Sequence, residues 1–160
     1  MSDWNLPLTY EELHEKYYYE DGKLYYKKNN KIAGGFHKST GYFNIEIEKR
    51  CFGVHRIIFA LLTKSTPIVV DHCDGNRTNN NIDNLRSASY QQNAFNRATA
   101  TNNTSGIKGV YWNKDKKKWR AHIKIDNKQE HLGYFNTLED AKTARIDAAK
   151  KYHGEYVRHA

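Results

Sequence analysis

The sequence has little cysteine, and the cysteines it has are not arranged to bind zinc or to frame a secreted fold. Cys51 and Cys73 are the only two in 160 residues. They form no Cys-x-x-Cys pair, which argues against a structural zinc site. One possible disulfide does not make a secreted scaffold, so we expect a protein of the reducing cytoplasm.

Targeting signals and long apolar stretches are also missing. The first seven residues, Met-Ser-Asp-Trp-Asn-Leu-Pro, contain neither the basic region nor the apolar region of a signal peptide. The longest apolar run is far too short to span a bilayer. We therefore expect no membrane partner.

Apolar residues make up only 38% of the chain and the mean hydropathy is −0.93, which predicts a small core. A length of 160 residues suffices for one ordinary domain or two small ones. Aromatic residues help to fill such a core, and the chain has 12 Tyr, 6 Phe and 3 Trp.

Acidic residues are outnumbered, giving a net charge of +8 that is distributed unevenly. Residues 101–160 hold 13 Lys and Arg against 7 Asp and Glu, a net of +6, whereas residues 1–100 hold 13 against 11, a net of +2. Cations placed on phosphates release condensed counterions, so this balance favours a polyanion partner. Charge alone also fits a merely soluble basic protein.

Residues 8–62 are expected to form a short helix opened by Thr9, strands at residues 23–26 and 42–47, and an apolar helix at residues 54–62. In the second strand, Phe43, Ile45 and Ile47 alternate with polar residues, which is the period of a half-buried strand. The helix at residues 54–62 is mostly apolar and is predicted to be a supporting wall.

Residues 107–160 form a second expected unit, preceded by a small, polar stretch at residues 98–106 that we interpret as a linker. Strands are predicted at residues 109–112, 119–125 and 129–135, followed by a helix whose start, Thr137 with Asp140, resembles a capping box. One helix face is expected to carry Leu138, Ala141, Ala144, Ala148 and Tyr152. The prediction is a three-stranded antiparallel sheet with one helix on its back.

Strand alternation gives this sheet two different faces. Trp119, Ala121, Ile123 and Ile125 should point toward the helix. The polar side chains Arg120, His122 and Lys124 should point away from it, together with Gln129 and His131 on the third strand.

The most specific pattern lies in residues 69–97. A short apolar run ends in Asp71 and His72, a polar turn follows, and then come a second short strand around residues 84–86 and a helix-like segment that carries Asn93. Imidazole, with an ordinary pKa of roughly 6.5, is a good proton acceptor near neutral pH. Carboxylate and amide oxygens suit Mg²⁺ or Mn²⁺ rather than zinc. An isolated Asp-His pair would usually be a turn or a surface hydrogen bond, but the ordered set is far more specific.

At this point the chain resembles the HNH nuclease motif, in the form found in phage and bacterial homing-type endonucleases. The matching residues are Asp71-His72, Asp74-Gly75-Asn76, Asn79-Asn80, Asn84-Leu85-Arg86, Gln92-Asn93 and Asn96, preceded by Val54-His55-Arg56. Residue by residue, the resemblance implies a ββα-metal fold in which His72 activates water.

The same resemblance implies roles for further residues of the motif. Asp71 and Asn93 would bind the metal, and Asn84 would hold the loop through backbone hydrogen bonds. The third motif position is often His, so Asn93 makes this an H-N-N variant, with Asn96 as the second choice of ligand. Arg56 would hold a phosphate or pair with Glu46 or Glu48. For His55 we favour a core-facing hydrogen bond over a functional role.

Residues 107–156 resemble a second family, the Apetala-two/ethylene-response-factor DNA-binding domain. The resemblance rests on Gly109-Val110-Tyr111-Trp112, Trp119-Arg120-Ala121, Leu132-Gly133-Tyr134-Phe135, the helix that begins at Thr137, and Gly154. In that family the sheet enters the major groove of DNA. The DNA-binding residues implied here are Lys108, Tyr111, Lys114, Arg120, His122, Lys124, Gln129 and His131. Bidentate arginine is scarce in this set, so we expect readout to depend more on phosphate contacts.

Together these observations predict an α+β protein with three parts. Residues 1–97 would hold the nuclease module, with its core motif at residues 54–97, residues 98–106 the linker, and residues 107–160 the DNA-binding domain. The expected function is a metal-dependent endonuclease that nicks double-stranded DNA with some site preference, using Mg²⁺ or Mn²⁺, as a monomer or weak dimer. If phage-encoded, it would act in the bacterial cytoplasm. The alternatives are a sequence-specific DNA-binding regulator with a vestigial nuclease module, a structural phage protein, and a nuclease that acts on RNA.

Overall fold

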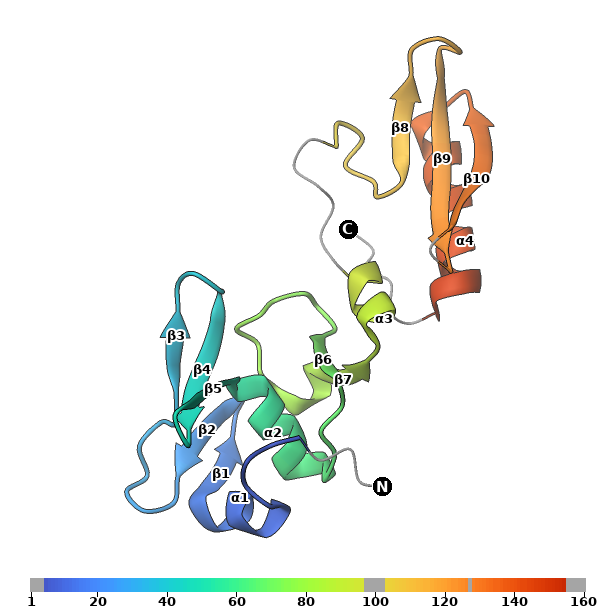
Figure 1. Cartoon of the computed structure of the whole chain (residues 1–160). Coiled ribbons are helices and arrows are strands. Elements are labelled where there is room, and N and C mark those ends of the chain that lie inside the picture. The colour runs from blue at the N-terminus through green and yellow to red at the C-terminus, as the bar shows by residue number, and fades with distance from the viewer. Residues whose placement is uncertain (1–4, 97–102, 127, 155–160) are drawn as a thin grey trace. The chain divides into compact units, whose positions relative to one another are not determined.

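The protein is described here by a computed structural model that covers residues 5–96, 103–126 and 128–154 (Figure 1). The chain divides into two compact units, Met1–Asn93 and Ala94–Ala160. Each unit is described by itself. No helix among the described residues is long and apolar enough to cross a membrane.

The first unit combines short helices with small antiparallel sheets (Figure 1). Its elements are, in order, α1 (Tyr10–Lys16), β1 (Tyr17–Glu20), β2 (Lys23–Tyr26), β3 (Gly35–His37), β4 (Tyr42–Ile47), β5 (Arg50–Gly53), α2 (Val54–Thr63), β6 (Val69–His72), the 3-10 turn η1 (Ile82–Asn84) and β7 (Leu85–Ala88). Helix α3 (Tyr90–Phe95) follows β7, and its last two residues belong to the second unit. Strands β1 and β2 form one hairpin, β3, β4 and β5 form a sheet in that order, and β6 pairs with β7.

The helices and strands that the sequence predicted in this unit are present. Helix α1 begins with a capping box, in which the backbone nitrogen of Glu12 donates to Thr9 Oγ1 over 3.2 Å and the Thr9 nitrogen donates to Glu12 Oε2 over 2.7 Å. Strands β2 and β4 have the expected bounds, and α2 ends one residue later than expected. Strands β1, β3 and β5 were not predicted.

Helix α2 is the centre of the first unit's core. Its buried residues include Ile57 and Ile58, which have no exposed surface. Leu13 of α1, Leu24 of β2 and Val70 of β6 join the same apolar cluster. The helix therefore supports the pair β6–β7 from behind, as a wall on which the polar residues of that pair are positioned.

The second unit is a three-stranded antiparallel sheet with one helix packed on it, as the sequence predicted. The strands are β8 (Val110–Asn113), β9 (Lys118–Ile125) and β10 (Lys128–Phe135), in the order β10-β9-β8, and the helix is α4 (Leu138–His153). Thr137 caps α4 by accepting from the Asp140 nitrogen over 3.1 Å. Ala121 and Ile123 are buried against the helix, so the predicted inward face of β9 is confirmed.

The inner face of α4 differs from the apolar stripe that we expected. Tyr152 is 47% exposed, whereas Arg145 and His153 are buried together with Ala141, Ala148 and Ala149. His153 can lie inside because its Nε2 is 2.8 Å from the carbonyl oxygen of Lys124. A hydrogen bond to β9, rather than a tyrosine ring, thus fixes the last turn of α4.

Strand β10 contains a β-bulge that was not predicted. His131 pairs with His122 and Gly133 pairs with Ala121, so Leu132 is an extra residue in the register. Gly133 has φ +138°, a region that favours glycine. After the bulge the alternation is shifted by one residue, so Tyr134 pairs with Arg120.

The predicted linker at residues 98–106 falls partly outside the described residues. Its described end is a turn that is tied to β8. Asn103 Oδ1 accepts from the Ser105 nitrogen over 2.9 Å, and Ser105 Oγ donates to the carbonyl of Val110 over 2.6 Å.

Candidate active site and nucleic-acid interface

His72 is the last residue of β6, and its side chain is bound to Asn80. The Nε2 atom lies 3.0 Å from Asn80 Oδ1, and both residues are buried. An amide oxygen can only accept, so the proton of the neutral imidazole lies on Nε2. The lone pair is then on Nδ1, which is the nitrogen able to accept a proton.

Asn84 ties the loop between β6 and β7 together. Its Oδ1 accepts from the Asp74 nitrogen over 3.0 Å, and its Nδ2 donates to Asp74 Oδ1 over 3.0 Å and to the carbonyl of Asn79 over 2.8 Å. The backbone hydrogen bonds that we expected of Asn84 are therefore present in the loop.

Asp74 is held as a charged group inside this loop. Burial acts to raise its pKa, but hydrogen bonds from the Asn79 side chain, the Asn76 backbone and the Asn84 side chain together lower it below its ordinary value. The loop is thus closed by amide groups around one carboxylate.

Asp71 precedes His72 on β6, and adjacent strand residues point to opposite faces. Its direct partner across the sheet is Arg86 of β7. Arg86 Nη2 lies 2.9 Å and Nε 3.1 Å from Asp71 Oδ2, and Asp71 is 5% exposed. The sequence suggested Asp71 as a metal ligand but did not reveal this ion pair, because it depends on the register of the two strands.

Asn93 lies on α3, the helix that follows β7. The helix begins with a reciprocal cap, in which the Gln92 nitrogen donates to Ser89 Oγ over 3.1 Å and the Ser89 nitrogen donates to Gln92 Oε1 over 2.7 Å. The Asn93 side chain is half-buried, and Asn96, the second choice of ligand, is buried just after the helix.

The donor set fits a hard divalent cation. The described residues contain no group of three or more His, Cys, Asp or Glu side chains that could hold a metal. The candidates are instead one carboxylate, Asp71, and the amide oxygen of Asn93. Mg²⁺ keeps several of its waters and commonly takes only one or two protein ligands, so this pair is chemically suitable for it.

The ring of His72 lies in a cluster with the rings of Tyr42 and His55. The ring centroids of His55 and His72 are 4.9 Å apart, those of Tyr42 and His55 are 5.1 Å apart, and those of Tyr42 and His72 are 5.9 Å apart. The core-facing hydrogen bond that we favoured for His55 is not formed by Nδ1, which is buried without a partner among the described residues. Burial, then the nearby His72 and Arg56, lower the pKa of His55 to about 3, so this ring is neutral at any ordinary pH.

Arg56 is used inside the first unit. Its Nη1 donates to the carbonyl of Ile68 over 2.8 Å, and its Nη2 donates to the carbonyl of Pro67 over 3.1 Å. The described residues show no ion pair between Arg56 and Glu46 or Glu48. In this arrangement its guanidinium positions the segment that leads into β6.

The second unit carries its polar residues on the face of the sheet away from α4. Across the strands, Arg120 pairs with Tyr111 of β8, and His122 pairs with His131 of β10. Lys124 pairs with Gln129 in the same way. Five of the eight residues predicted for DNA binding in this unit therefore come from β9 and β10, and Tyr111 from β8.

Arg120 is held at the centre of this open face. Its Cζ lies 5.6 Å from the Tyr111 ring centre, and its Nε lies 3.4 Å from His131 Nδ1. The Tyr111 and His122 rings contact each other edge-to-face at 5.7 Å. Burial, then Arg120, Arg145 and His131, lower the pKa of His122, so it is a neutral hydrogen-bonding group at neutral pH.

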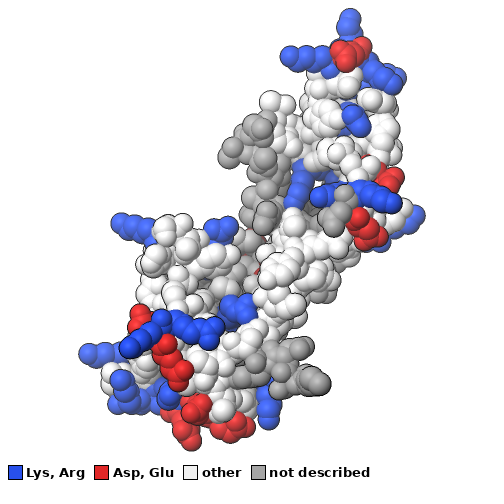
Figure 2. Space-filling model, in the orientation of Figure 1, with Lys and Arg blue, Asp and Glu red and all other residues white. Residues whose placement is uncertain are grey.

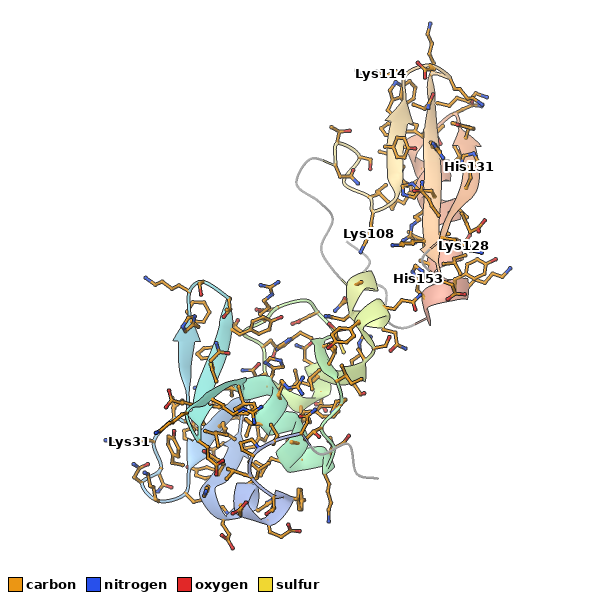
Figure 3. All side chains as sticks on the ribbon, in the orientation of Figure 1. Lys31, Lys108, Lys114, Lys128, His131 and His153 are labelled. Atoms are coloured by element: carbon orange, nitrogen blue, oxygen red, sulfur yellow. The ribbon has the colours of Figure 1, made fainter. Side chains whose placement is uncertain are left out.

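The two remaining predicted residues lie at the edges of the second unit (Figure 3). Lys114 is exposed near the β8–β9 turn. The Lys108 ammonium donates to the carbonyl of Ala94 over 3.0 Å. Both come from segments next to β8 rather than from the face of the sheet itself.

Sequence reasoning missed Tyr134 on the open face and Lys116 in the turn between β8 and β9. The Tyr134 ring contacts His131, with centroids 4.7 Å apart, and Lys116 Nζ lies 4.3 Å from its centre. Unbroken alternation from Gln129 and His131 would turn Tyr134 toward the helix. The bulge reverses this, and Gly133 was the available signal for it.

Comparison with known proteins gave two family matches. A model described as HNH endonuclease matches residues 52–95, and an AP2 domain model matches residues 105–155. Protein 3.8 of Escherichia phage T7 is 35% identical over 89 residues, which are 56% of this chain and 73% of that protein. A mimivirus protein named as an uncharacterized HNH endonuclease is 39% identical over 107 residues, which are 65% of this chain but only 54% of the relative. No solved structure gave a significant match.

Proposed function

Because the chain belongs to the HNH endonuclease family and carries an AP2 domain, we propose that it is a metal-dependent endonuclease that hydrolyses phosphodiester bonds of duplex DNA. The observation that carries the proposal is the pairing of His72 with Asn80, which leaves Nδ1 as the proton acceptor. Asp71 lies next to it in sequence but on the other face of the strand.

In this proposal each candidate site residue of the first unit has a separate role. His72 accepts, through Nδ1, the proton of the water that attacks the phosphorus atom. Asn80 orients the imidazole, and Asn84 keeps the loop closed. Asp71 and Asn93 hold Mg²⁺ or Mn²⁺, and a bound ion of this kind stabilises the negative charge that develops on the phosphate. The products carry 5′-phosphate and 3′-hydroxyl ends.

The second unit holds the DNA and gives it some site preference. Its open face presents Arg120, Lys124 and Gln129 for contacts with phosphates and base edges. One site per chain makes a monomer a nickase, since a double-strand break needs two chains or two events.

Supercoiled plasmid DNA tests this proposal with Mg²⁺, with Mn²⁺ and with EDTA. Wild type and a His14→Gln control should convert it to open circles only with metal, and His72→Ala should not. His14 is a suitable control because it is a histidine of the same unit whose partner is the Leu61 carbonyl on α2, not a residue of the loop between β6 and β7. If plain plasmid stays intact, the DNA of the source genome is the next substrate. Failure on both with DNA binding intact would favour a DNA-binding regulator instead.

A further inference from the structure

Arg77, in the loop that follows β6, is an exposed cation that the β3–β4 hairpin holds in place. Its Nη1 donates to the carbonyl of Thr40 in the hairpin turn over 2.9 Å. Its Cζ lies 4.9 Å from the ring centre of Tyr42, the first residue of β4. Two separate contacts thus fix a guanidinium that solvent still reaches.

The same tyrosine connects Arg77 to the base. The Tyr42 ring lies 5.9 Å from the His72 ring. Together the two distances put the Arg77 Cζ within about 11 Å of the His72 ring, which corresponds to about three phosphates along one DNA strand. A strand whose phosphate reaches His72 therefore has a neighbouring phosphate within reach of Arg77.

The charge of Arg77 is not neutralised by the residues around it. Its two contacts are a carbonyl and an aromatic ring, and the ion pairs of the described residues do not include it. Asp74, the acidic residue of the same loop, is instead bound by Asn76, Asn79 and Asn84.

A second exposed cation, Lys38, lies in the turn of the hairpin. On the face that Figure 2 presents, Lys and Arg atoms but no Asp or Glu atoms lie over the tip of β3–β4. This positive tip lies on the first unit, whose net charge is small, so the local excess is not a consequence of overall composition.

We propose that Arg77 and Lys38 form a phosphate-binding surface that holds the backbone of the DNA strand being cut beside His72. The surface is distinct from the open face of the second unit, and the inference rests on the proposed nuclease function. Arginine suits this task because its planar fork of donors matches phosphate geometry, and its contacts here set the direction of that fork. The competing interpretation is that Arg77 only ties the loop to the hairpin.

DNA binding by the full chain in EDTA separates the two interpretations without requiring cleavage. The measurement is the slope of log affinity against log salt concentration. Arg77→Gln and Lys38→Gln should each reduce the magnitude of this slope by about one, because each removes one phosphate contact. Arg77→Lys should retain the slope, since it keeps the charge.

Arg50→Gln is the matched control. Arg50 is also exposed and also lies over an aromatic ring, 5.4 Å from the centre of Phe52. It stands at the start of β5 and pairs with Ile47, at the opposite end of β4 from Tyr42. Its loss should leave the slope unchanged.

Cleavage kinetics provide the second readout. Arg77→Gln should lower kcat/KM by about tenfold, mainly through KM, because it weakens binding of the strand rather than proton transfer. If Arg77→Gln fails to fold, Lys38→Gln decides, because no contact holds that exposed side chain in the described structure. Wild-type slopes and wild-type kcat/KM in both Gln variants would overturn the inference. Metal-dependent cleavage with unchanged slopes would overturn the phosphate-binding inference and leave the nuclease function intact. Reduced slopes without any cleavage by wild type would support phosphate binding and overturn the nuclease function.

Discussion

The Nε2 atom of His72 donates to Oδ1 of Asn80 over 3.0 Å, and both side chains are buried. This bond determines which imidazole nitrogen carries the proton. Asn80→Ala should therefore lower kcat by about 10- to 100-fold with little change in KM, because a group that orients a functional histidine is removed. It should also cost about 1–3 kcal/mol of stability, since a buried donor is left unpaired.

Single-turnover cleavage and thermal melting measure these two effects. Asn81→Ala is the neighbouring control, because Asn81 caps η1 by accepting from the Asp83 nitrogen over 3.1 Å and does not contact His72. An Asn80→Ala protein with the wild-type kcat would show that the bond has no part in the reaction.

His55 makes the stability of the first unit depend on pH. The pKa of His55 in the folded chain, about 3, is below the ordinary 6.5. Above pH 6.5 this imidazole is therefore neutral in both the folded and the unfolded state, and it does not lower the free energy of unfolding. As the pH falls from 6.5 toward 3, His55 becomes protonated in the unfolded chain but stays neutral in the folded chain. The free energy of unfolding should then fall by about 1.4 kcal/mol per pH unit from this group.

Urea unfolding at a series of pH values measures that slope. His55→Asn should make the free energy of unfolding less dependent on pH between pH 6.5 and 3, even if the variant is less stable at every pH. His37→Asn, a change at an exposed histidine of β3, is the control and should keep the wild-type dependence. Equal slopes for wild type and His55→Asn would contradict the assignment.

Asp71 should link the stability of the first unit to divalent metal. Addition of Mn²⁺ should raise the Tm of wild type, because a ligand that binds only the folded state stabilises it. Asp71→Asn should abolish the rise and should itself be less stable, since Arg86 loses its buried carboxylate. Asp83→Asn, a change at the neighbouring η1, should respond to metal as wild type does. The same metal-induced rise in Asp71→Asn would remove Asp71 from the ligand set.

Tyr134 should contribute to DNA binding although no motif pointed to it. Its ring contacts both His131 and Lys116, so Tyr134→Ala should free two DNA-facing groups and weaken binding by about 1–2 kcal/mol, or about 5- to 30-fold. Tyr134→Phe should bind almost as wild type, because the ring remains. Tyr152→Ala is matched, since Lys151 lies 5.0 Å from that ring on α4, away from the open face. Fluorescence anisotropy measures the DNA affinity of each variant. A Tyr134→Ala protein that binds DNA as tightly as wild type would refute the prediction.

The elements predicted correctly from sequence are those with one buried face. Helix α2 and strand β9 bury regular stripes, and periodicity detects such stripes directly. Strand β3 is exposed at all three of its residues, and β1 and β5 have four residues each. Their pairing with neighbours, rather than any stripe of their own, makes them strands, so no local pattern could have revealed them.

The candidate site was predictable in kind but not in its contacts. The order of Asp71, His72, Asn84 and Asn93 was visible in the sequence, because the motif is defined by residue types and their spacing. That Arg86 binds Asp71 depends on strand register, and that Arg77 binds the turn at Thr40 depends on a contact between residues 37 positions apart. Neither register nor long-range contact is encoded by the residue types alone.

The extra residue in β10 has a consequence for anyone who redesigns or aligns this domain. Before Leu132 the odd-numbered positions point to the open face, and after it the even-numbered ones do. If Leu132 paired in regular alternation instead of forming the bulge, inside and outside would exchange for the whole end of the strand, turning Phe135 to solvent and Tyr134 into the core. Libraries that vary DNA specificity should therefore randomise Gln129, His131 and Tyr134 together. An alignment that ignores the bulge would instead select core residues such as Phe135 for randomisation.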